Sequence, residues 1–248
     1  MKIQQNTRRA IVIGASSGIG QQLARLLLHD GWLLGVAARR EDPLAQLAND
    51  FPGQVVWSII DVTDAQAAEQ LDLLVRKRGG MNLFIYASGV GKKNPYLDPE
   101  PEEVTLRTNA VGFTRMVGTA YRHFARQGSG HIAVITSIAG VRGLGPSPSY
   151  SATKALQSTY LEALEQQSHA RGLKIRFTDI RPGFIDTPLL HGDQFPHTMS
   201  ADKASKSILK AVYRNRHVVY IDGFWHAVVL LMRMAPRALW RRINLNRG

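Results

Sequence analysis

The sequence has no cysteine, no long apolar run and few acidic residues for its length. The lack of cysteine excludes disulfide bonds, thiolate metal sites and a cysteine nucleophile. The opening residues MKIQQNTRRA contain no apolar stretch of the kind found in secretory signals, so we expect a cytoplasmic protein. Apolar residues make up 44% and charged residues 20% of the chain, and these proportions exclude wholesale disorder.

Basic residues outnumber acidic ones by 31 to 19, which gives a net charge of +12. The excess is uneven, because residues 201–248 contain ten Lys and Arg but two Asp, a net charge of +8. Such a segment attracts phosphate groups, anionic lipid or nucleic acid, or else forms a solvated surface. The sequence has no motif of a known nucleic-acid module, so we expect no nucleic-acid partner.

The order of apolar segments indicates one α/β domain. Strands are predicted at residues 10–14, 32–38, 55–60, 83–87, 131–137, 174–180 and 218–221. Helical patterns lie between them, at residues 19–29, 43–49, 64–78, 102–126, 149–171 and 201–214. This alternation predicts a Rossmann-type, doubly wound parallel sheet of about seven strands with helices on both faces. We expect this domain over residues 1–222, followed by a basic, apolar extension over residues 223–248.

A glycine-rich loop follows the first predicted strand and leads into a helix. It reads Gly14-Ala15-Ser16-Ser17-Gly18-Ile19-Gly20. Glycine permits sharp turns and lets backbone N–H groups approach a pyrophosphate at a helix N-terminus. In this position the loop predicts a dinucleotide site, to which we assign Gly14, Ser16, Ser17, Gly18, Ile19 and Gly20.

Two arginines follow the second predicted strand, where an NAD site usually places an acidic residue for the ribose 2′-hydroxyl. Ala38 takes that position, and Arg39 and Arg40 come next. Guanidinium groups pair well with a 2′-phosphate. The sequence therefore favours NADP(H), with NAD(H) as the alternative, unless both arginines pair with Glu41 and Asp42 on the surface.

Tyr150 and Lys154 lie four residues apart at the start of a predicted helix, so their side chains share one face. A nearby ammonium group favours phenolate and lowers the pKa of a tyrosine. The pair can then exchange a proton with an alcohol or carbonyl oxygen. Ser137 ends the fifth predicted strand, where its hydroxyl can bond the same oxygen.

With the glycine loop, Ser137 and the Tyr-Lys pair in this order, the chain resembles the classical short-chain dehydrogenase/reductase family over about residues 8–188. The resemblance implies an oxidoreductase that transfers hydride between a nicotinamide cofactor and a carbonyl or secondary alcohol, and that forms a homodimer or homotetramer. It implies that Asn109 joins Ser137, Tyr150 and Lys154 in catalysis, and that Tyr150 and Lys154 also contact the cofactor. It adds further cofactor residues, namely Asp61, Val62, Gly89, Pro182, Gly183, Ile185 and Thr187.

The sequence offers an alternative role for Asp61 and departs from the family motif before Gly89. Asp61 could instead cap the following helix, since Asp is a favoured N-cap residue. The chain reads Tyr86-Ala87-Ser88-Gly89 where the family usually has Asn-Asn-Ala-Gly. The departure keeps the glycine but removes two asparagines that would tie neighbouring strands together.

Residues 183–200 are expected to form a substrate loop, with a pocket walled by Phe184, Leu189, Leu190, Phe195 and Met199. His191 and His197 lack a third convincing ligand, so no metal site is predicted. Residues 224–242 are too short and too charged to span a membrane. They could pack over the cleft or at a subunit interface, or lie on the inner face of a membrane. The alternative to an enzyme is a non-catalytic nucleotide-sensing or membrane-surface interaction protein on the same fold.

Overall fold

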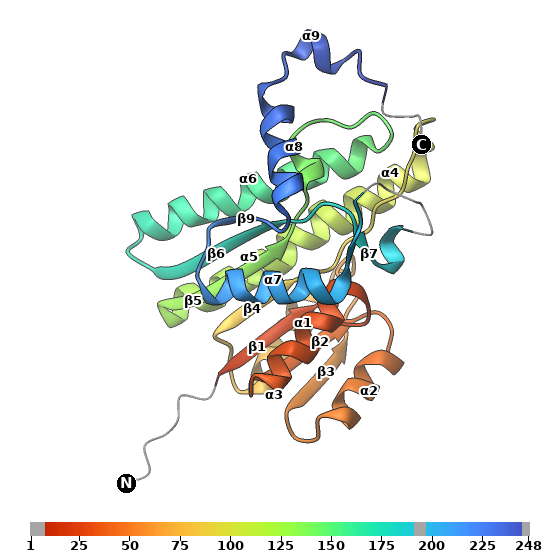
Figure 1. The fold of residues 1–248 in the computed structure, drawn as a ribbon. Coiled ribbons are helices and arrows are strands. Elements are labelled where there is room, and N and C mark those ends of the chain that lie inside the picture. Colours follow the sequence, from red (N-terminus) through yellow and green to blue (C-terminus); the bar gives the residue numbers. More distant parts are fainter. Residues whose placement is uncertain (1–7, 191–196, 245–248) are drawn as a thin grey trace.

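The main sheet has seven strands in the order β3-β2-β1-β4-β5-β6-β9 (Figure 1). A computed structural model describes residues 8–190 and 197–244. In it the strands are β1 (Arg9–Ile13), β2 (Leu33–Ala38), β3 (Val55–Ile59), β4 (Leu83–Tyr86), β5 (Ser129–Ile135), β6 (Lys174–Arg181) and β9 (Val218–Tyr220). All six pairings are parallel. The predicted doubly wound sheet is therefore confirmed, and each predicted strand corresponds to one observed strand.

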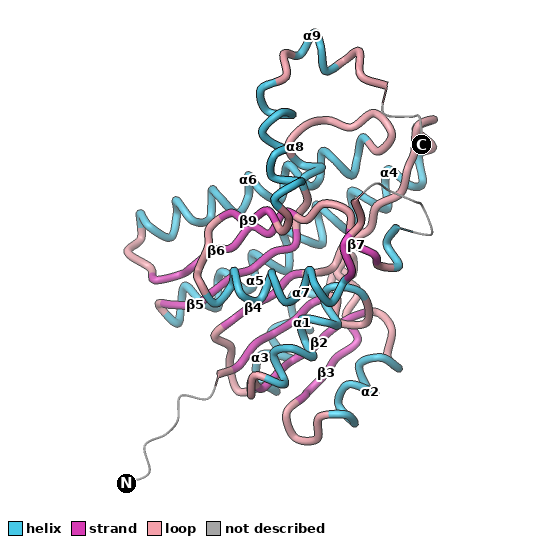
Figure 2. Tube along the Cα trace, in the orientation of Figure 1, coloured by secondary structure: helices cyan, strands magenta, loops and turns pink. Residues whose placement is uncertain are grey.

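Helices cover both faces of this sheet (Figures 1 and 2). The helices α1 (Gly18–His29), α2 (Asp42–Asp50) and α7 (Ala201–Tyr213) pack on one face, and α3 (Ala67–Arg78), α5 (Phe113–Gln127) and α6 (Pro148–Ala170) pack on the other. Strand residues alternate between the two cores: Ile11 and Ile13 belong to one, Ala10 and Val12 to the other. Burial of both faces explains why the strands read as nearly continuous apolar runs.

The helix predicted over residues 102–126 is interrupted in the structure. It consists of α4 (Pro99–Leu106), a π-helical turn η1 (Arg107–Gly112) and α5. The structure is helical throughout the predicted range, but the sequence pattern does not reveal the π turn, because a single π turn leaves the apolar periodicity on either side almost unchanged. Such turns occur frequently at functional sites, and this one contains Asn109.

Several short elements follow the strand ends. They are the 3-10 turns η2 (Ile138–Gly140) and η3 (Pro188–Leu190) and the paired strands β7 (Ile185–Asp186) and β8 (Met199–Ser200). The chain ends in α8 (Gly223–Met234) and α9 (Arg237–Trp240), which rise away from the sheet in Figure 1. Within the described ranges, no helix has the length and apolar character needed to cross a membrane.

Candidate active site

The glycine-rich loop between β1 and α1 is shaped by close backbone contacts. Gly14 has a φ of +88°, and a Cβ at this position would lie 2.7 Å from the backbone nitrogen of Ser88. A Cβ at Gly20 would lie 2.2 Å from the carbonyl oxygen of Gly14. Both positions therefore require glycine. The loop leads directly into the N-terminus of α1, which is the arrangement that binds a pyrophosphate.

The two arginines after β2 lie on the same side of the molecule as this loop. Arg40 donates from its guanidinium to the backbone oxygen of Ser16 at 3.2 Å and to its hydroxyl at 3.1 Å. Arg39 is exposed. Positive charge is thus fixed at the end of β2 beside the loop, as a phosphate site requires.

Asp61 and Val62 follow β3 and have different surroundings. Partial burial raises the pKa of Asp61, but hydrogen bonds from the backbone N–H and hydroxyl of Thr63, with the charge of Arg39, outweigh it and lower the pKa. Helix α3 begins six residues later, at Ala67, so Asp61 does not cap it. Val62 is buried.

Ser137, Tyr150 and Lys154 come together where β5 meets α6. Ser137 caps the η2 turn, its Oγ accepting from the backbone N–H of Ala139 at 3.0 Å. Tyr150 and Lys154 lie on α6, with the ammonium nitrogen 5.7 Å from the centre of the tyrosine ring. A Cβ at Gly140 would lie 2.7 Å from the carbonyl carbon of Lys154. The turn that carries the serine therefore touches the helix that carries the other two side chains.

Burial shifts the pKa of both titratable side chains. It raises the pKa of the Tyr150 phenol, and a hydrogen bond with Ser137 offsets only part of this effect. It lowers the pKa of Lys154 to about 8, while the Asp179 carboxylate acts in the opposite direction. The expected lowering of the tyrosine pKa by Lys154 is not found, because removal of water from the phenol is the largest effect on this pKa and raises it. At neutral pH Tyr150 keeps its proton.

A buried hydrogen-bond network connects Lys154 to the π-helical turn. The Lys154 ammonium donates to the carbonyl oxygen of Ile135 at 3.0 Å and to Oε1 of Gln157 at 3.1 Å. Gln157 donates in turn from Nε2 to the backbone oxygen of Asn109 at 2.8 Å. Gln157 is fully buried. Sequence reasoning missed this residue, and its only signal was a polar side chain three positions after the lysine.

The side chain of Asn109 holds the loop that follows β4. Its Oδ1 accepts from the backbone N–H of Val90 at 2.9 Å, and its Nδ2 donates to the Val90 carbonyl at 2.7 Å. Nδ2 also lies 3.3 Å from the Thr153 hydroxyl on α6. A Cβ at Gly89 would lie 3.3 Å from Asn109 Oδ1, and one at Gly91 would lie 2.7 Å from the Tyr150 ring. The glycines thus let this loop pass close to both side chains.

The departure at Tyr86-Ala87-Ser88 does not break the sheet. Tyr86 is fully buried, and its ring packs edge-to-face on Phe113 with 5.4 Å between centroids. Strand β4 pairs with β1 on one side and β5 on the other. Aromatic packing and backbone pairing thus hold β4 in the sheet without the two asparagines.

The segment after β6 reaches both the serine turn and the glycine loop. The Pro182 carbonyl accepts from the backbone N–H of Ile138 at 3.1 Å. The methyl group of Thr187 lies 3.2 Å from where a Cβ of Gly18 would be. Ile185 is buried and pairs with β8. The structure therefore brings the predicted nicotinamide segment to the same edge as the other predicted residues.

The predicted substrate loop is only partly described. Phe184 packs edge-to-face on Trp225 of α8, whose indole also leaves no room for a Cβ at Gly183. Leu189 and Leu190 form the η3 turn and Met199 lies in β8. Phe195 and His191 lie outside the described residues. His197 is 2.7 Å from the Asp222 carboxylate.

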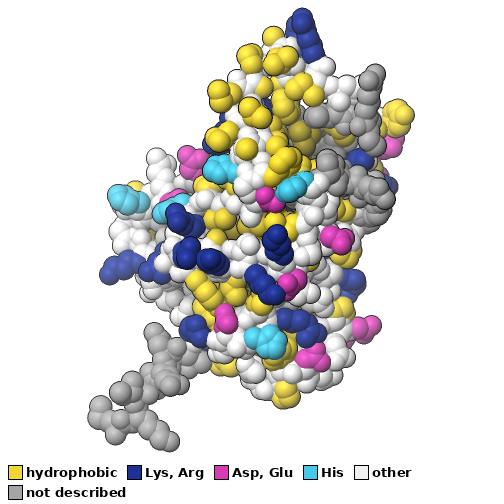
Figure 3. All heavy atoms as spheres, in the orientation of Figure 1, with side chains coloured by type: hydrophobic (Ala, Val, Ile, Leu, Met, Phe, Trp, Pro, Cys, Tyr) yellow, Lys and Arg dark blue, Asp and Glu magenta, His cyan; other side chains and the backbone are white. Residues whose placement is uncertain are grey.

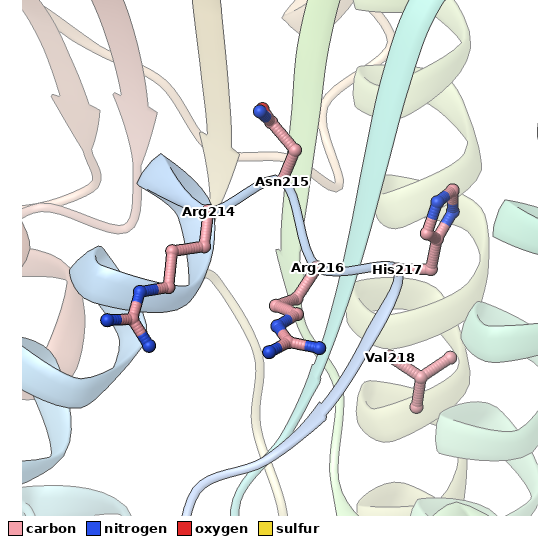
Figure 4. A pocket seen from close by; sticks show the side chains of 5 residues that line it. All are labelled: Arg214, Asn215, Arg216, His217 and Val218. Carbon is pink, nitrogen blue, oxygen red and sulfur yellow. The ribbon is translucent and has the colours of Figure 1, made fainter.

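A separate hollow lies at the start of β9, away from these residues. Its volume is about 530 Å³, and it is lined by Arg214, Asn215, Arg216, His217 and Val218 (Figure 4). It is open and formed by a loop that precedes a strand. The candidate catalytic and cofactor residues instead follow strand ends, where ligands bind in sheets of this topology.

Comparison with known proteins identifies the family. A family profile described as short chain dehydrogenase matches residues 8–194. This chain belongs to that family. A Myxococcus xanthus protein described as an uncharacterized oxidoreductase is 33% identical over 202 residues, covering 78% of each chain. A Mycobacterium tuberculosis protein with the same description is 30% identical and covers 95% of this chain and 97% of its own.

Solved structures of short-chain dehydrogenases share the fold. A Burkholderia cenocepacia enzyme in complex with NADP superposes with a TM-score of 0.82 at 24% identity, covering 97% of this chain and 98% of its own. A Sphingobium yanoikuyae enzyme in complex with NADPH has a TM-score of 0.80 at 22% identity, with the same coverage. The present short-chain dehydrogenase therefore has the family's architecture over nearly its whole length.

Proposed function

We propose that this protein transfers hydride between NADP(H) and a carbonyl or secondary alcohol carbon of a small molecule. The observation that carries the proposal is the meeting of Ser137, Tyr150 and Lys154 at β5 and α6, on the sheet edge that also bears the glycine loop. The NADP and NADPH complexes of the two structural neighbours support the choice of cofactor. A nicotinamide bound there would supply the hydride.

The protein supplies the proton and the orientation of the substrate. The Ser137 hydroxyl would bond the substrate oxygen. Tyr150, protonated at neutral pH because burial raises its pKa, would donate its proton to that oxygen during reduction and accept it during oxidation. Carbonyl, reduced cofactor and one proton then give alcohol and oxidised cofactor, with solvent restoring the tyrosine proton.

Lys154 and its neighbours would stabilise the charge left on the tyrosine. The Lys154 ammonium faces the Tyr150 ring and would favour the phenolate that forms as the proton leaves. Two N–H groups of its ammonium donate to the Ile135 carbonyl and to Gln157 Oε1. We assign the third N–H group to the nicotinamide ribose. Asn109 would hold the loop after β4, and Gln157 would position the lysine.

The remaining cofactor contacts are proposed from the position of each loop at the carboxyl ends of the strands. The glycine loop would bind the pyrophosphate, the end of β2 the 2′-phosphate, the end of β3 the adenine, and the loops after β4 and β6 the nicotinamide. The residues proposed for these contacts are Gly14, Ser16, Ser17, Gly18, Ile19, Gly20, Arg39, Arg40, Asp61, Val62, Gly89, Pro182, Gly183, Ile185 and Thr187. The homodimer or homotetramer and the cytoplasmic location stay predictions.

Two measurements test the function. NADPH binding is followed by fluorescence titration, and turnover is followed by loss of NADPH absorbance with a panel of ketones and aldehydes. We expect saturable NADPH binding and turnover of at least one carbonyl class. Binding without turnover of any carbonyl or alcohol would favour a nucleotide-sensing protein, and absence of binding would contradict the proposal altogether.

Replacing Arg39 by Asp is expected to shift the cofactor preference toward NADH. The new carboxylate repels a 2′-phosphate and can accept from a ribose 2′-hydroxyl. Loss of a hydrogen bond to a charged group corresponds to a roughly 10- to 100-fold fall in the ratio of kcat/KM for NADPH to that for NADH. Arg76→Asp, an exposed arginine at the end of α3, is the matched control. An unchanged ratio in Arg39→Asp would remove Arg39 from the 2′-phosphate site.

A further inference from the structure

The end of the chain presents an apolar surface that the rest of the protein does not cover. The α8–α9 surface consists of Phe224, Leu230, Leu231, Met234, Leu239 and Ile243, all of which are exposed. Leu231 and Met234 are 69% and 78% exposed. Figure 3 shows hydrophobic side chains gathered over this end of the molecule. Exposed apolar patches of this kind mark interaction sites.

The opposite face of α8 is packed against the body of the protein. Val229 is fully buried and Trp225 nearly so, one helical turn apart, in a cluster with Ile138. Since Trp225 and Val229 face inward while Leu231 and Met234 face outward, α8 is apolar on both sides. A helix that needed only to pack on the domain would have polar residues on its outer face.

Polar contacts hold the surface in place. The Arg142 guanidinium donates to the carbonyl oxygens of Met232 at 2.9 Å and of Arg233 at 3.3 Å, and also to that of Ala235. The Trp240 indole donates to the Gly143 carbonyl at 3.0 Å. The Arg142 bonds satisfy carbonyls at the C-terminus of α8, and the Trp240 bond connects α9 to the loop after η2, so the surface is part of the fold.

Positive charge lies in the same segment as this surface. Arg233, Arg237, Arg241 and Arg242 are exposed within α8, α9 and the residues that follow. Residues 223–248 contain no aspartate or glutamate. The segment therefore combines exposed apolar side chains with a net positive charge.

We propose that the α8–α9 surface docks on an anionic lipid membrane, with its helices lying in the interface. Anionic headgroups complement the arginines, and the acyl boundary takes up the apolar side chains. Two copies joined through this surface would set arginines against arginines with no carboxylate from the segment to pair them. A nucleic acid would satisfy the arginines but not side chains such as Leu231 and Met234.

Vesicle flotation of the full chain tests the proposal. The probes are vesicles of phosphatidylcholine mixed with phosphatidylglycerol and vesicles of phosphatidylcholine alone. We expect the protein to float with the mixed vesicles and not with the neutral ones. Leu231→Ser with Met234→Ser, and separately Arg241→Gln with Arg242→Gln, should each lower the fraction bound on the order of 10-fold or more. All four side chains are exposed, so the variants should fold normally.

Lys206→Gln with Lys210→Gln is the matched control, because it removes the same charge from exposed positions of α7. Wild-type binding by this control supports the assignment to α8 and α9. Equal loss in the control would show that net charge alone drives binding and would overturn the proposal. Absence of wild-type flotation would do the same, as would a wild-type dimer that Leu231→Ser with Met234→Ser converts to a monomer.

Discussion

Tyr150→Phe is expected to remove nearly all turnover while leaving NADPH binding intact. Phenylalanine keeps the ring that packs beside Gly91 and Lys154 but has no proton to give. A positioned general acid contributes about 10²- to 10⁴-fold to a rate, and kcat should fall by that factor. Steady-state assays on the carbonyl with the highest wild-type activity measure the change, and fluorescence titration measures NADPH affinity.

Tyr160→Phe provides the control for this experiment. Tyr160 lies on the same helix and is also partly buried, with its ring edge-to-face on Phe113. Loss of its hydroxyl should leave turnover close to wild type, since it lies almost three turns further along α6. If Tyr150→Phe kept a rate within about tenfold of wild type, Tyr150 would not be the acid–base group.

The central strands β1, β2, β4 and β5 were predictable because they are buried on both faces. Segments such as Ala10-Ile11-Val12-Ile13 contribute alternate side chains to two cores, and this produces an apolar run short enough to be distinguished from a helix. The glycine loop was equally easy to recognise in the sequence. Glycine is required at positions 14 and 20, because a Cβ there would lie under 3 Å from backbone atoms. Sterically forced residues leave a local signature in the sequence.

Features set by three-dimensional surroundings left no such signature. The direction of the Tyr150 pKa shift depends on how much water the fold removes from the phenol, which spacing from Lys154 cannot reveal. The π turn at residues 107–112 changes hydrogen bonding without changing residue types. The resemblance identified Asn109 by its motif, but the partner of its backbone oxygen, Gln157, comes from a different helix.

Gln157→Leu and Gln157→Glu are expected to move the alkaline limb of the pH profile in opposite directions. Burial lowers the pKa of Lys154 to about 8, and Gln157 Oε1 accepts from the ammonium at 3.1 Å. Leucine removes this acceptor, so the pKa of Lys154 should fall further and activity should be lost at lower pH. Glutamate adds a negative charge, so the pKa should rise and the limb should move to higher pH.

The leucine variant should also lose activity at neutral pH. A hydrogen bond to a charged group corresponds to a roughly 10- to 100-fold change, and kcat/KM for the carbonyl substrate should fall by about the lower figure. The backbone oxygen of Asn109 would lose the Nε2 donor as well. Urea denaturation should therefore show a loss of about 1–3 kcal/mol in the free energy of unfolding.

Comparison of the two variants separates positioning from packing. A side chain that only filled space between α6 and the π turn would lower stability in both variants without moving the pH limb. Gln167→Leu, at an exposed position on the same helix, controls for the general effect of replacing glutamine by leucine. Opposite shifts in the two Gln157 variants, with none in the control, require that Gln157 acts on the charge of Lys154. A limb that stays fixed in both would reduce Gln157 to a packing residue.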